Sequence, residues 1–233
     1  MQVKFYKFKM KKIPILVVRF KNELNFKEIP LFRGAVIDKT SKSNNLLFHN
    51  HQGNDVLRYR YPFIQYKRLN KRATLVCIGD GVEVIGQFFA SGNFDLRIGE
   101  QMLKFEVDTI SPSQQIIQIW DTTFFYSIRK WLPLNKENFL HYQNLQSLSE
   151  KCCFLEAILN ANILSMSKSL GIFFDKQIKC SIQLIEKEQI CVYKNVKMIA
   201  LDLFFITNVS LPNYIGLGKG VSVGFGIIKQ MKK

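Results

Sequence analysis

Three histidines are the side chains best suited to acid–base chemistry in this 233-residue chain: His49, His51 and His141. An imidazole with an unperturbed pKa of ~6.5 can accept or donate a proton near neutral pH. His49 and His51 share the polar stretch from Phe48 to Asp55, and their spacing of two places them on opposite faces if that stretch is extended. His141 lies in a segment with helical spacing, where we expect a packing or surface role.

A metal site is the weaker interpretation of the histidine pair. No third histidine lies nearby in the sequence, so further ligands would have to come from Asp55 or from distant residues. His-Asn-His is also not the motif of the HNH nucleases, whose members are spread along a ββα-metal fold. The five cysteines are odd in number and contain no Cys-x-x-Cys pair, which argues against both a zinc site and a disulfide framework. We therefore expect no metal and no cofactor.

A glycine-rich segment near the C-terminus, Gly216-Leu-Gly-Lys-Gly-Val-Ser-Val-Gly-Phe-Gly226, is the second feature with chemical potential. Glycine permits positive φ and lets backbone N–H groups approach a ligand closely, and such amide concavities bind phosphates. Only seven residues follow Gly226, so the segment cannot open the βαβ unit of a dinucleotide-binding fold. A P-loop is excluded because no Ser or Thr follows Lys219 at the required place. The plain alternative is a glycine-rich hairpin or bulge. The residues that we predict to contact phosphate are Gly216, Gly218, Lys219, Gly220, Gly224 and Gly226.

The stretch from Leu57 to Arg72 holds six basic residues and no acidic one. In an extended strand, Arg58 and Arg60 point one way while Tyr59 and Tyr61 point the other. Cations contact phosphates, and aromatic planes stack on unpaired bases. The alternative is an ordinary amphipathic strand with solvated cations. The consensus motif of RRM domains is absent, so we do not infer base stacking of the RRM kind. The predicted cationic contacts are Arg33, Arg58, Arg60 and Arg68.

Charge and composition favour a folded protein that binds a polyanion. Lys and Arg number 33 against 18 Asp and Glu, and the excess is +9 in residues 1–116 and +6 in residues 117–233. An excess in both halves favours a long polyanion that crosses both, although a basic proteome would also produce it. Hydrophobic residues make up 47% of the chain, which is enough for a core. No stretch approaches the ~18 uncharged apolar residues of a membrane span, and no signal peptide is recognisable. We therefore expect a cytoplasmic protein with no membrane partner.

The glycine-rich segment resembles the loop of the CRISPR repeat-RNA processing endoribonucleases, which belong to the RAMP superfamily. The resemblance rests on Gly-Leu-Gly, then five residues, then Gly-Phe-Gly near the C-terminus. Three further segments are similar to those of one short branch of that family: Phe32-Arg-Gly-Ala-Val36, Phe48-His-Asn-His51 and Tyr61-Pro-Phe-Ile-Gln-Tyr-Lys67. The resemblance implies that the chain binds CRISPR repeat RNA (pre-crRNA).

The resemblance also implies a catalytic site. In that family a histidine after the first helix acts in acid–base catalysis, a role that passes here to His49 or His51, with His49 slightly preferred. Family sites often add a tyrosine from the first helix, but residues 26–40 contain none. Lys67 or Arg33 would then supply the electrostatic stabilisation. The implied reaction is metal-independent attack by the RNA 2′-hydroxyl, which leaves a 2′,3′-cyclic phosphate.

Two tandem units of strand, helix, strand, strand, helix, strand are expected to position these residues. The predicted elements of the first unit are strands at 3–9 and 13–20, a helix at 30–40, strands at 57–68 and 73–78, a helix at 80–89 and strands at 94–119 with a hairpin turn at Gly99-Glu100. Those of the second are a strand at 124–132, a helix at 135–170 capped by Asn135 and ended by Gly171, strands at 178–185, 190–193 and 200–207, a vestigial helix at 211–215 and a strand at 225–229.

The fold class is therefore predicted to be α+β, with tandem ferredoxin-like (βαββαβ) units and a C-terminal glycine-rich loop. The predicted domains are residues 1–119, with the candidate catalytic histidines, and residues 120–233, with the loop. Two functions stay open on the residues: an endoribonuclease that matures CRISPR RNA, or a non-catalytic RNA-binding subunit of a CRISPR ribonucleoprotein. Subunits of a CRISPR effector complex are the further partners considered. A metal-dependent nuclease lacks the acidic cluster that it needs.

Overall fold

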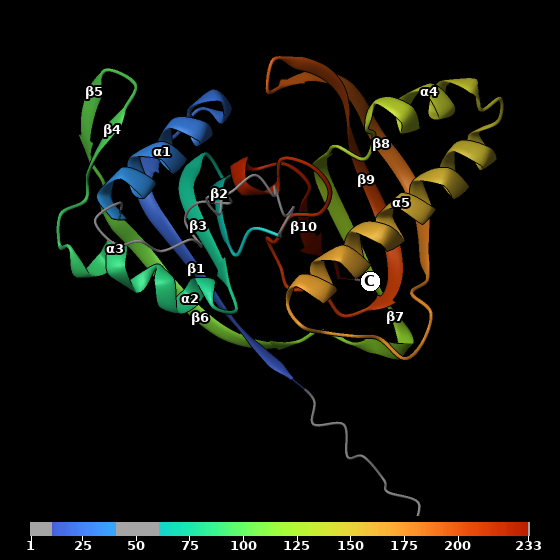
Figure 1. Cartoon of the computed structure of the whole chain (residues 1–233), viewed down its shortest axis with the longest axis horizontal. Coiled ribbons are helices and arrows are strands. Elements are labelled where there is room, and N and C mark those ends of the chain that lie inside the picture. Colours follow the sequence, from blue (N-terminus) through green and yellow to red (C-terminus); the bar gives the residue numbers. More distant parts are fainter. Residues whose placement is uncertain (1–10, 41–60, 233) are drawn as a thin grey trace, which may run out of the picture.

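The first half of the chain forms an antiparallel sheet with helices on one face (Figure 1). The computed structural model describes residues 11–40 and 61–232. Strand order is β2-β3-β1-β6, and every neighbouring pair is antiparallel. The elements of this half are β1 (Lys12–Glu23), the 3-10 turn η1 (Phe26–Glu28), α1 (Ile29–Thr40), β2 (Ile64–Leu69), β3 (Arg72–Ile78), α2 (Gly81–Val84), α3 (Gly86–Ala90), β4 (Asp95–Ile98), β5 (Gln101–Lys104) and β6 (Val107–Ile116).

The second half repeats this plan. Its sheet has the order β10-β7-β9-β8, again antiparallel throughout. The elements are β7 (Ile119–Trp131), α4 (Lys136–Asn144), α5 (Leu148–Ser169), β8 (Cys180–Tyr193), β9 (Val196–Val209), the 3-10 turn η2 (Val221–Val223) and β10 (Ile227–Gln230). When only the four strands of each large sheet are numbered in chain order, leaving out the separate β4-β5 hairpin, both sheets have the order 4-1-3-2. This order confirms the predicted α+β fold of tandem ferredoxin-like units.

Most elements predicted in the described part are present with small shifts of their ends. The helix at 30–40 is α1, the hairpin turns at Gly99-Glu100, and the predicted helix at 80–89 is broken into α2 and α3. The strand predicted at 57–68 begins at Ile64 among the described residues, and that predicted at 3–9 lies outside them. β6 ends at Ile116 and β7 begins at Ile119. The limits 1–119 and 120–233 of the two domains stay a prediction.

The helix predicted at 135–170 is wrong as one piece. Asn135 is its N-cap as expected, since its side-chain oxygen accepts a hydrogen bond from the N–H of Asn138 at 2.7 Å. A second start follows at Ser147, whose hydroxyl accepts from the N–H of Glu150 at 3.1 Å while Glu150 accepts from the N–H of Ser147 at 2.8 Å. This capping box begins α5 and separates it from α4.

Two other predictions in the second half are wrong. The strands predicted at 178–185 and 190–193 are one continuous strand, β8, because the polar residues from Lys187 to Gln189 between them also pair with β9. Residues 211–215 are not helical: Pro212 lies in this segment, and Tyr214 has a left-handed φ of +69°. The final strand begins at Ile227, two residues later than predicted.

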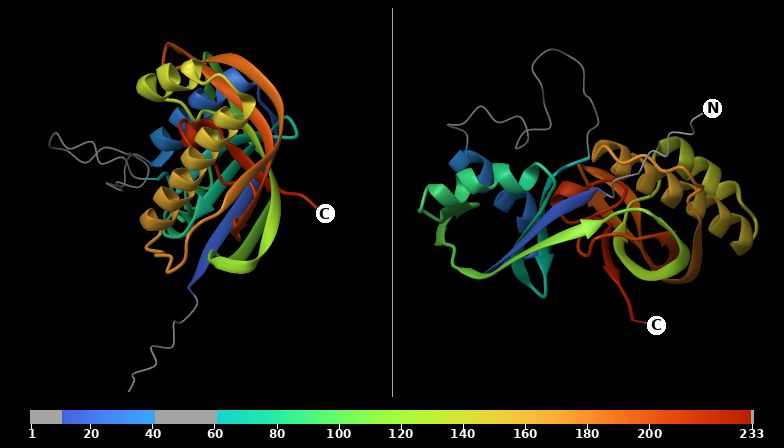
Figure 2. Two further views of the ribbon diagram at one scale, coloured as in Figure 1. Left: turned by 90° about the vertical axis from the view of Figure 1, so that its right-hand side faces the viewer. Right: turned by 90° about the horizontal axis from the view of Figure 1, so that it is seen from below.

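The inner face of the C-terminal sheet is covered partly by α5 and partly by the N-terminal unit. Between β9 and β10, all of which the structure describes, the one helical piece is the short turn η2. A single buried cluster joins the face of the N-terminal sheet that carries Ile15 and Val76 to Trp131 of β7 and Leu159 of α5. The two units therefore share a core, and the glycine-rich loop lies at the seam between them (Figures 1 and 2). No helix in residues 11–40 and 61–232 is long and apolar enough to cross a membrane.

Candidate functional site

The glycine-rich loop folds tightly upon itself and upon its neighbours. Gly218, Gly220, Gly224 and Gly226 all have left-handed φ, between +63° and +87°. A Cβ on Gly226 would overlap the carbonyl oxygen of Leu217, and a Cβ on Gly218 would lie 2.8 Å from the indole nitrogen of Trp131. Side chains at these positions are therefore excluded by the protein itself, before any ligand is considered.

This packing by itself explains why these positions are glycine, without the phosphate contact that the sequence suggested. A Cβ on Gly216 would lie 2.7 Å from Val221, and one on Gly220 would lie 2.7 Å from the ring of Phe225. Most of the loop is buried, and its accessible part is the tip, where Lys219 is exposed. A phosphate could reach the backbone at this tip and the ammonium of Lys219. Contact between the loop and RNA stays a prediction.

Two side chains of the N-terminal unit bind both backbone groups of Gly216. The Tyr61 hydroxyl donates a hydrogen bond to the Gly216 carbonyl oxygen at 2.8 Å, and the Gly216 N–H donates to Oε1 of Gln65 at 3.0 Å. The Gln65 amide is itself oriented by donating to the carbonyl of Pro62 at 3.0 Å. Burial raises the pKa of the Tyr61 phenol, as expected of a hydroxyl that acts here as a neutral donor. We call Tyr61, Gln65 and Gly216 the loop clamp.

The far side of the loop packs against the start of α1. A Cβ on Gly224 would lie 2.9 Å from Cδ1 of Ile29, and the ring of Phe225 meets that of Phe26 edge-on, with 5.1 Å between centroids. The Lys130 ammonium lies 3.2 Å from the centroid of the Phe26 ring. The loop thus touches β2, the entry to α1 and the end of β7 at the same time.

Lys67, predicted as a catalytic residue, lies on β2 beside this loop. Its side chain is fully buried, and its ammonium has no hydrogen-bond partner among the described residues. Burial lowers the pKa of Lys67 to about 7. Because the side chain is fully buried, an ammonium here would stabilise negative charge on a ligand through its field and not through direct contact.

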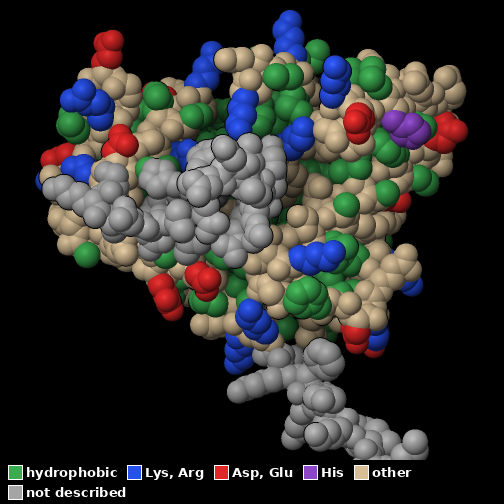
Figure 3. Space-filling model, viewed as in Figure 1, with side chains coloured by type: hydrophobic (Ala, Val, Ile, Leu, Met, Phe, Trp, Pro, Cys, Tyr) green, Lys and Arg blue, Asp and Glu red, His purple; other side chains and the backbone are tan. Residues whose placement is uncertain are grey.

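Two other side chains predicted as cationic contacts, Arg68 and Arg33, lie in the described part of the chain. Arg68, next to Lys67 on β2, donates from Nε to the carbonyl of Leu24 at 2.5 Å. Arg33 lies half-buried on α1, and its charge favours the ionised form of Tyr66. The structure therefore brings Lys67, Arg68 and the loop together at the seam, with Arg33 on the adjoining helix. Figure 3 shows Lys and Arg side chains gathered over this seam, between α1 and the hairpin of β8 and β9.

Four predicted site residues lie outside the described residues: His49, His51, Arg58 and Arg60. The remaining histidine, His141, is exposed on α4 with its ring centroid 4.7 Å from that of Phe154, as expected of a surface packing residue. Within residues 11–40 and 61–232, no three His, Cys, Asp or Glu side chains come together as metal ligands.

Sequence reasoning missed three residues of this region. Tyr61 and Gln65 bind a glycine more than 150 positions away, and no local pattern signals such a contact. Tyr66 carries a buried hydroxyl without a hydrogen-bond partner in the described part of the chain, and burial raises its pKa. Its side chain packs on α1, opposite to Lys67, because successive residues of a strand point to opposite faces.

Both halves of the chain match models of one protein family. Residues 11–115 match the Cas6b N-terminal domain, and residues 118–231 match the Cas6b C-terminal domain.

Two solved structures resemble the whole chain. A crystal structure of Cas6b matches with a TM-score of 0.85 and 28% identity, over 95% of this chain and 100% of that one. A crystal structure of the CRISPR RNA processing endoribonuclease Cas6b matches with a TM-score of 0.72 and 25% identity over the same shares. An uncharacterized protein of Methanocaldococcus jannaschii is 39% identical over 107 residues, which are 46% of this chain and 71% of that protein.

Proposed function

The chain belongs to the Cas6b family, and from this premise we propose that it binds CRISPR repeat RNA and cuts it by attack of a 2′-hydroxyl, without a metal ion. The observation that carries the proposal is the likeness over the full length of a CRISPR RNA processing endoribonuclease. That match covers 95% of this chain and 100% of the other, so it spans both ferredoxin-like units.

The seam supplies the binding surface. Lys219 is exposed at the loop tip in one unit, and the half-buried Arg68 lies on β2 in the other, so one RNA strand is proposed to contact both. Arg33, Arg58 and Arg60 extend the proposed contacts, as do Gly216, Gly218, Gly220, Gly224 and Gly226 through their backbone. Binding through phosphates is expected to weaken steeply as salt is raised.

The cleavage step needs a base, an acid and a stabilising charge. We assign proton transfer to His49 or His51: one of them takes the proton of the 2′-hydroxyl as the 2′-oxygen bonds to phosphorus. The phosphorus–5′-oxygen bond then breaks, and an acid protonates the departing 5′-oxygen. The products are a 2′,3′-cyclic phosphate and a 5′-hydroxyl. Lys67 is proposed to stabilise the negative charge on the pentacovalent phosphorus.

The proposed setting is the cytoplasm, where the cut guide RNA passes to subunits of a CRISPR effector complex. Because the product keeps the repeat-derived end that the seam binds, we expect it to dissociate slowly unless a partner takes it over.

The test is cleavage of the repeat RNA encoded in the protein's own genome, in buffer that contains EDTA. We expect the wild type and His141→Ala to cut the RNA, and His49→Ala or His51→Ala to lose about 100-fold or more in rate. Lys67→Met is expected to slow cleavage while it leaves RNA affinity within a few-fold of the wild type.

Tight binding by the wild type without cleavage would assign the chain instead to the non-catalytic RNA-binding subunits. Cleavage that only appears when Mg²⁺ or Mn²⁺ replaces EDTA would refute the metal-independent mechanism. His141→Ala is the matched control, because its imidazole is exposed on α4 and touches Phe154 rather than the seam.

A further inference from the structure

The C-terminal sheet has a second face that none of the helices in residues 11–40 and 61–232 covers. Tyr126, Ile128, Leu203 and Phe205 are buried on the inner face, in the cluster that includes α5. Their neighbours along β7 and β9 therefore point to the outer face. The left panel of Figure 2 shows the helices on one side of the sheets and the C-terminal end of the chain leaving on the other.

Two aromatic rings lie side by side in the middle of this outer face. Phe125 of β7 and Phe204 of β9 are stacked, with 5.7 Å between centroids and 26° between planes, and both are half-buried. β7 and β9 are the two central strands of the sheet. The arrangement comes from the register, because Phe204 is paired with Ser127, two residues along β7 from Phe125.

Charged side chains of both signs lie beside the ring pair. The Arg129 guanidinium lies 5.2 Å from the centroid of Phe204, and it also pairs with Glu186 and lies 3.7 Å from Asp202. Its charge is therefore largely matched within the protein. Lys229 is exposed on the neighbouring strand β10, directly across from Ser127, and no ion pair of it is found among the described residues.

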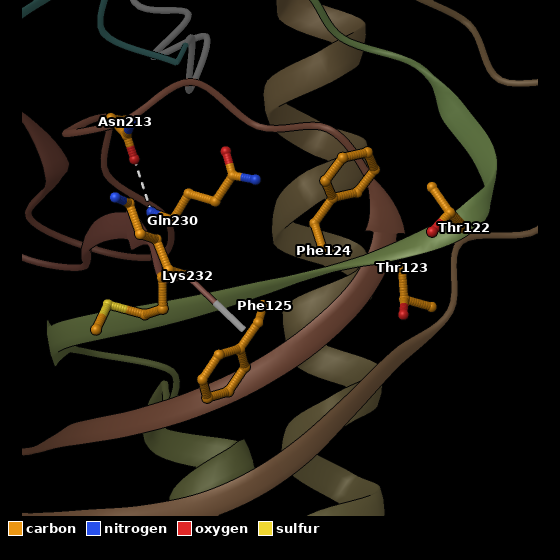
Figure 4. Close-up of a pocket in the computed structure, with 8 residues that line it drawn as sticks. Thr122, Thr123, Phe124, Phe125, Asn213, Gln230 and Lys232 are labelled. Atoms are coloured by element: carbon orange, nitrogen blue, oxygen red, sulfur yellow. Dashed lines mark hydrogen bonds between the residues drawn. The ribbon is translucent and has the colours of Figure 1, made fainter.

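A groove adjoins Phe125 at the end of β10 (Figure 4). Its volume is about 570 Å³, and Thr122, Thr123, Asn213 and Lys232 line it together with the phenylalanine. Figure 4 shows Phe124 and Phe125 pointing to opposite sides of β7. The Asn213 side-chain oxygen is occupied by the N–H of Gln230 at 2.6 Å, which leaves its amide as a donor. The groove thus offers hydroxyls, an amide and an ammonium beside an aromatic ring.

We propose that this outer face binds a single-stranded segment of RNA, with bases stacked on Phe125 and Phe204 and phosphates held by Lys229 and Lys232. In RRM domains, aromatic side chains on a four-stranded sheet stack two or three unpaired bases. This chain lacks the RRM consensus, so the proposal rests on the placement of Phe125 and Phe204 on the two central strands of such a sheet. The lysines make RNA a better fit for this face than an uncharged apolar partner. The inference rests on the proposed function only for the source of the RNA. It adds a second RNA contact, on a face of the protein away from the seam.

The first test uses a fluorescein-labelled 12-nucleotide oligouridylate, which contains no repeat sequence. Phe125→Leu and Phe204→Leu remove the aromatic planes but keep apolar side chains. Each is expected to weaken binding by about five- to a hundredfold, while Phe204→Tyr keeps most of the affinity. Phe173→Leu is the matched control, because Phe173 is 75% exposed and lies in the connection between α5 and β8, not on β7 or β9. Lys229→Gln with Lys232→Gln should also lower the slope of log Kd against log salt by about one to two.

The second test separates this face from the seam. Cleavage of the minimal repeat should be unchanged in Phe125→Leu and Phe204→Leu, whereas a repeat with a single-stranded extension should lose its added affinity. If the wild type fails to cut any repeat but the oligouridylate still depends on both rings, the proposed nuclease is wrong and this site stands.

Unchanged oligouridylate binding in the leucine and glutamine variants would overturn the inference. So would a dimer of the wild type that Phe204→Leu dissociates without any change in RNA affinity, because the face would then hold a second copy of the chain. If the leucine variants fail to fold, the glutamine pair and Phe204→Tyr carry the same test, since they leave the ring packing in place.

Discussion

Removing the hydroxyl of Tyr61 is expected to loosen the loop clamp and to destabilise the whole protein. Tyr61→Phe keeps the ring but leaves the carbonyl of Gly216 without its 2.8 Å hydrogen bond. Gly216 is buried, so water cannot replace the lost donor without a local rearrangement. Gln65→Leu removes the acceptor on the other side, which pairs with the Gly216 N–H at 3.0 Å.

The size of the effect follows from burial. A buried backbone group that loses its partner costs about 1–3 kcal/mol. For a chain of this length, 1 kcal/mol corresponds to about 2–4 °C in melting temperature. Because both side chains bind the same residue, the double variant should cost less than the sum of the single variants, with a coupling of about 0.5–2 kcal/mol.

The assay is urea unfolding of the wild type, the two single variants and the double variant, followed by tryptophan fluorescence. Trp131 is fully buried and contacts the loop at Gly218, so its emission reports on this region directly. Tyr142→Phe is the control, because its hydroxyl lies 3.5 Å from Glu188, at the limit of a hydrogen bond. The reasoning is refuted if Tyr61→Phe costs no more than Tyr142→Phe, or if the two clamp variants are simply additive.

Three further outcomes are expected. Burial lowers the pKa of Lys67 to about 7, so between about pH 7 and 10 the unfolded chain binds a proton that the folded chain does not, and stability should rise with pH by up to ~1.4 kcal/mol per unit. Lys67→Met should remove this rise in urea unfolding at pH 6, 7.5 and 9, and an unchanged slope would contradict it. Gly226→Ala should unfold the loop at a cost above about 3 kcal/mol, whereas Gly34→Ala, with open space on α1, should stabilise by about 0.5–1 kcal/mol; equal melting temperatures would show the packing argument to be wrong. Asn135→Ala should cost about 1 kcal/mol through loss of the α4 cap, measured by thermal unfolding, and no change would mean that this end frays in the wild type.

Local patterns predicted the elements whose structure is decided locally. The cap at Asn135, the turn at Gly99-Glu100 and the helix at 30–40 each follow from residues close in sequence. The single helix predicted at 135–170 is wrong because Ser147 and Glu150 form a second capping box inside it. The helix predicted at 211–215 is absent, because Pro212 constrains the backbone of this segment.

The seam and the outer face depend on contacts that no local pattern contains. Gln65 and Gly216 lie 151 positions apart, and the burial of Lys67 arises from the packing of two units. The five glycines are visible in the sequence, but the structural reason for them is not. Neighbouring atoms leave no room for a Cβ at four of them, and these atoms belong to Trp131, Val221, Phe225 and Leu217. Phe125 and Phe204 likewise become a pair only through the register of β7 and β9. The roles of His49 and His51 stay a prediction from the family resemblance.

In the proposed reaction the RNA supplies its own nucleophile, and the protein supplies the proton transfers and the stabilising charge. The most direct test is one repeat RNA made in two forms, which differ only in a 2′-hydroxyl or a 2′-hydrogen at the scissile nucleotide, each incubated with the protein in EDTA. We predict equal affinity for both forms, cleavage of the hydroxyl form alone, and a 2′,3′-cyclic phosphate on its product. Cleavage of both forms at similar rates would contradict the account.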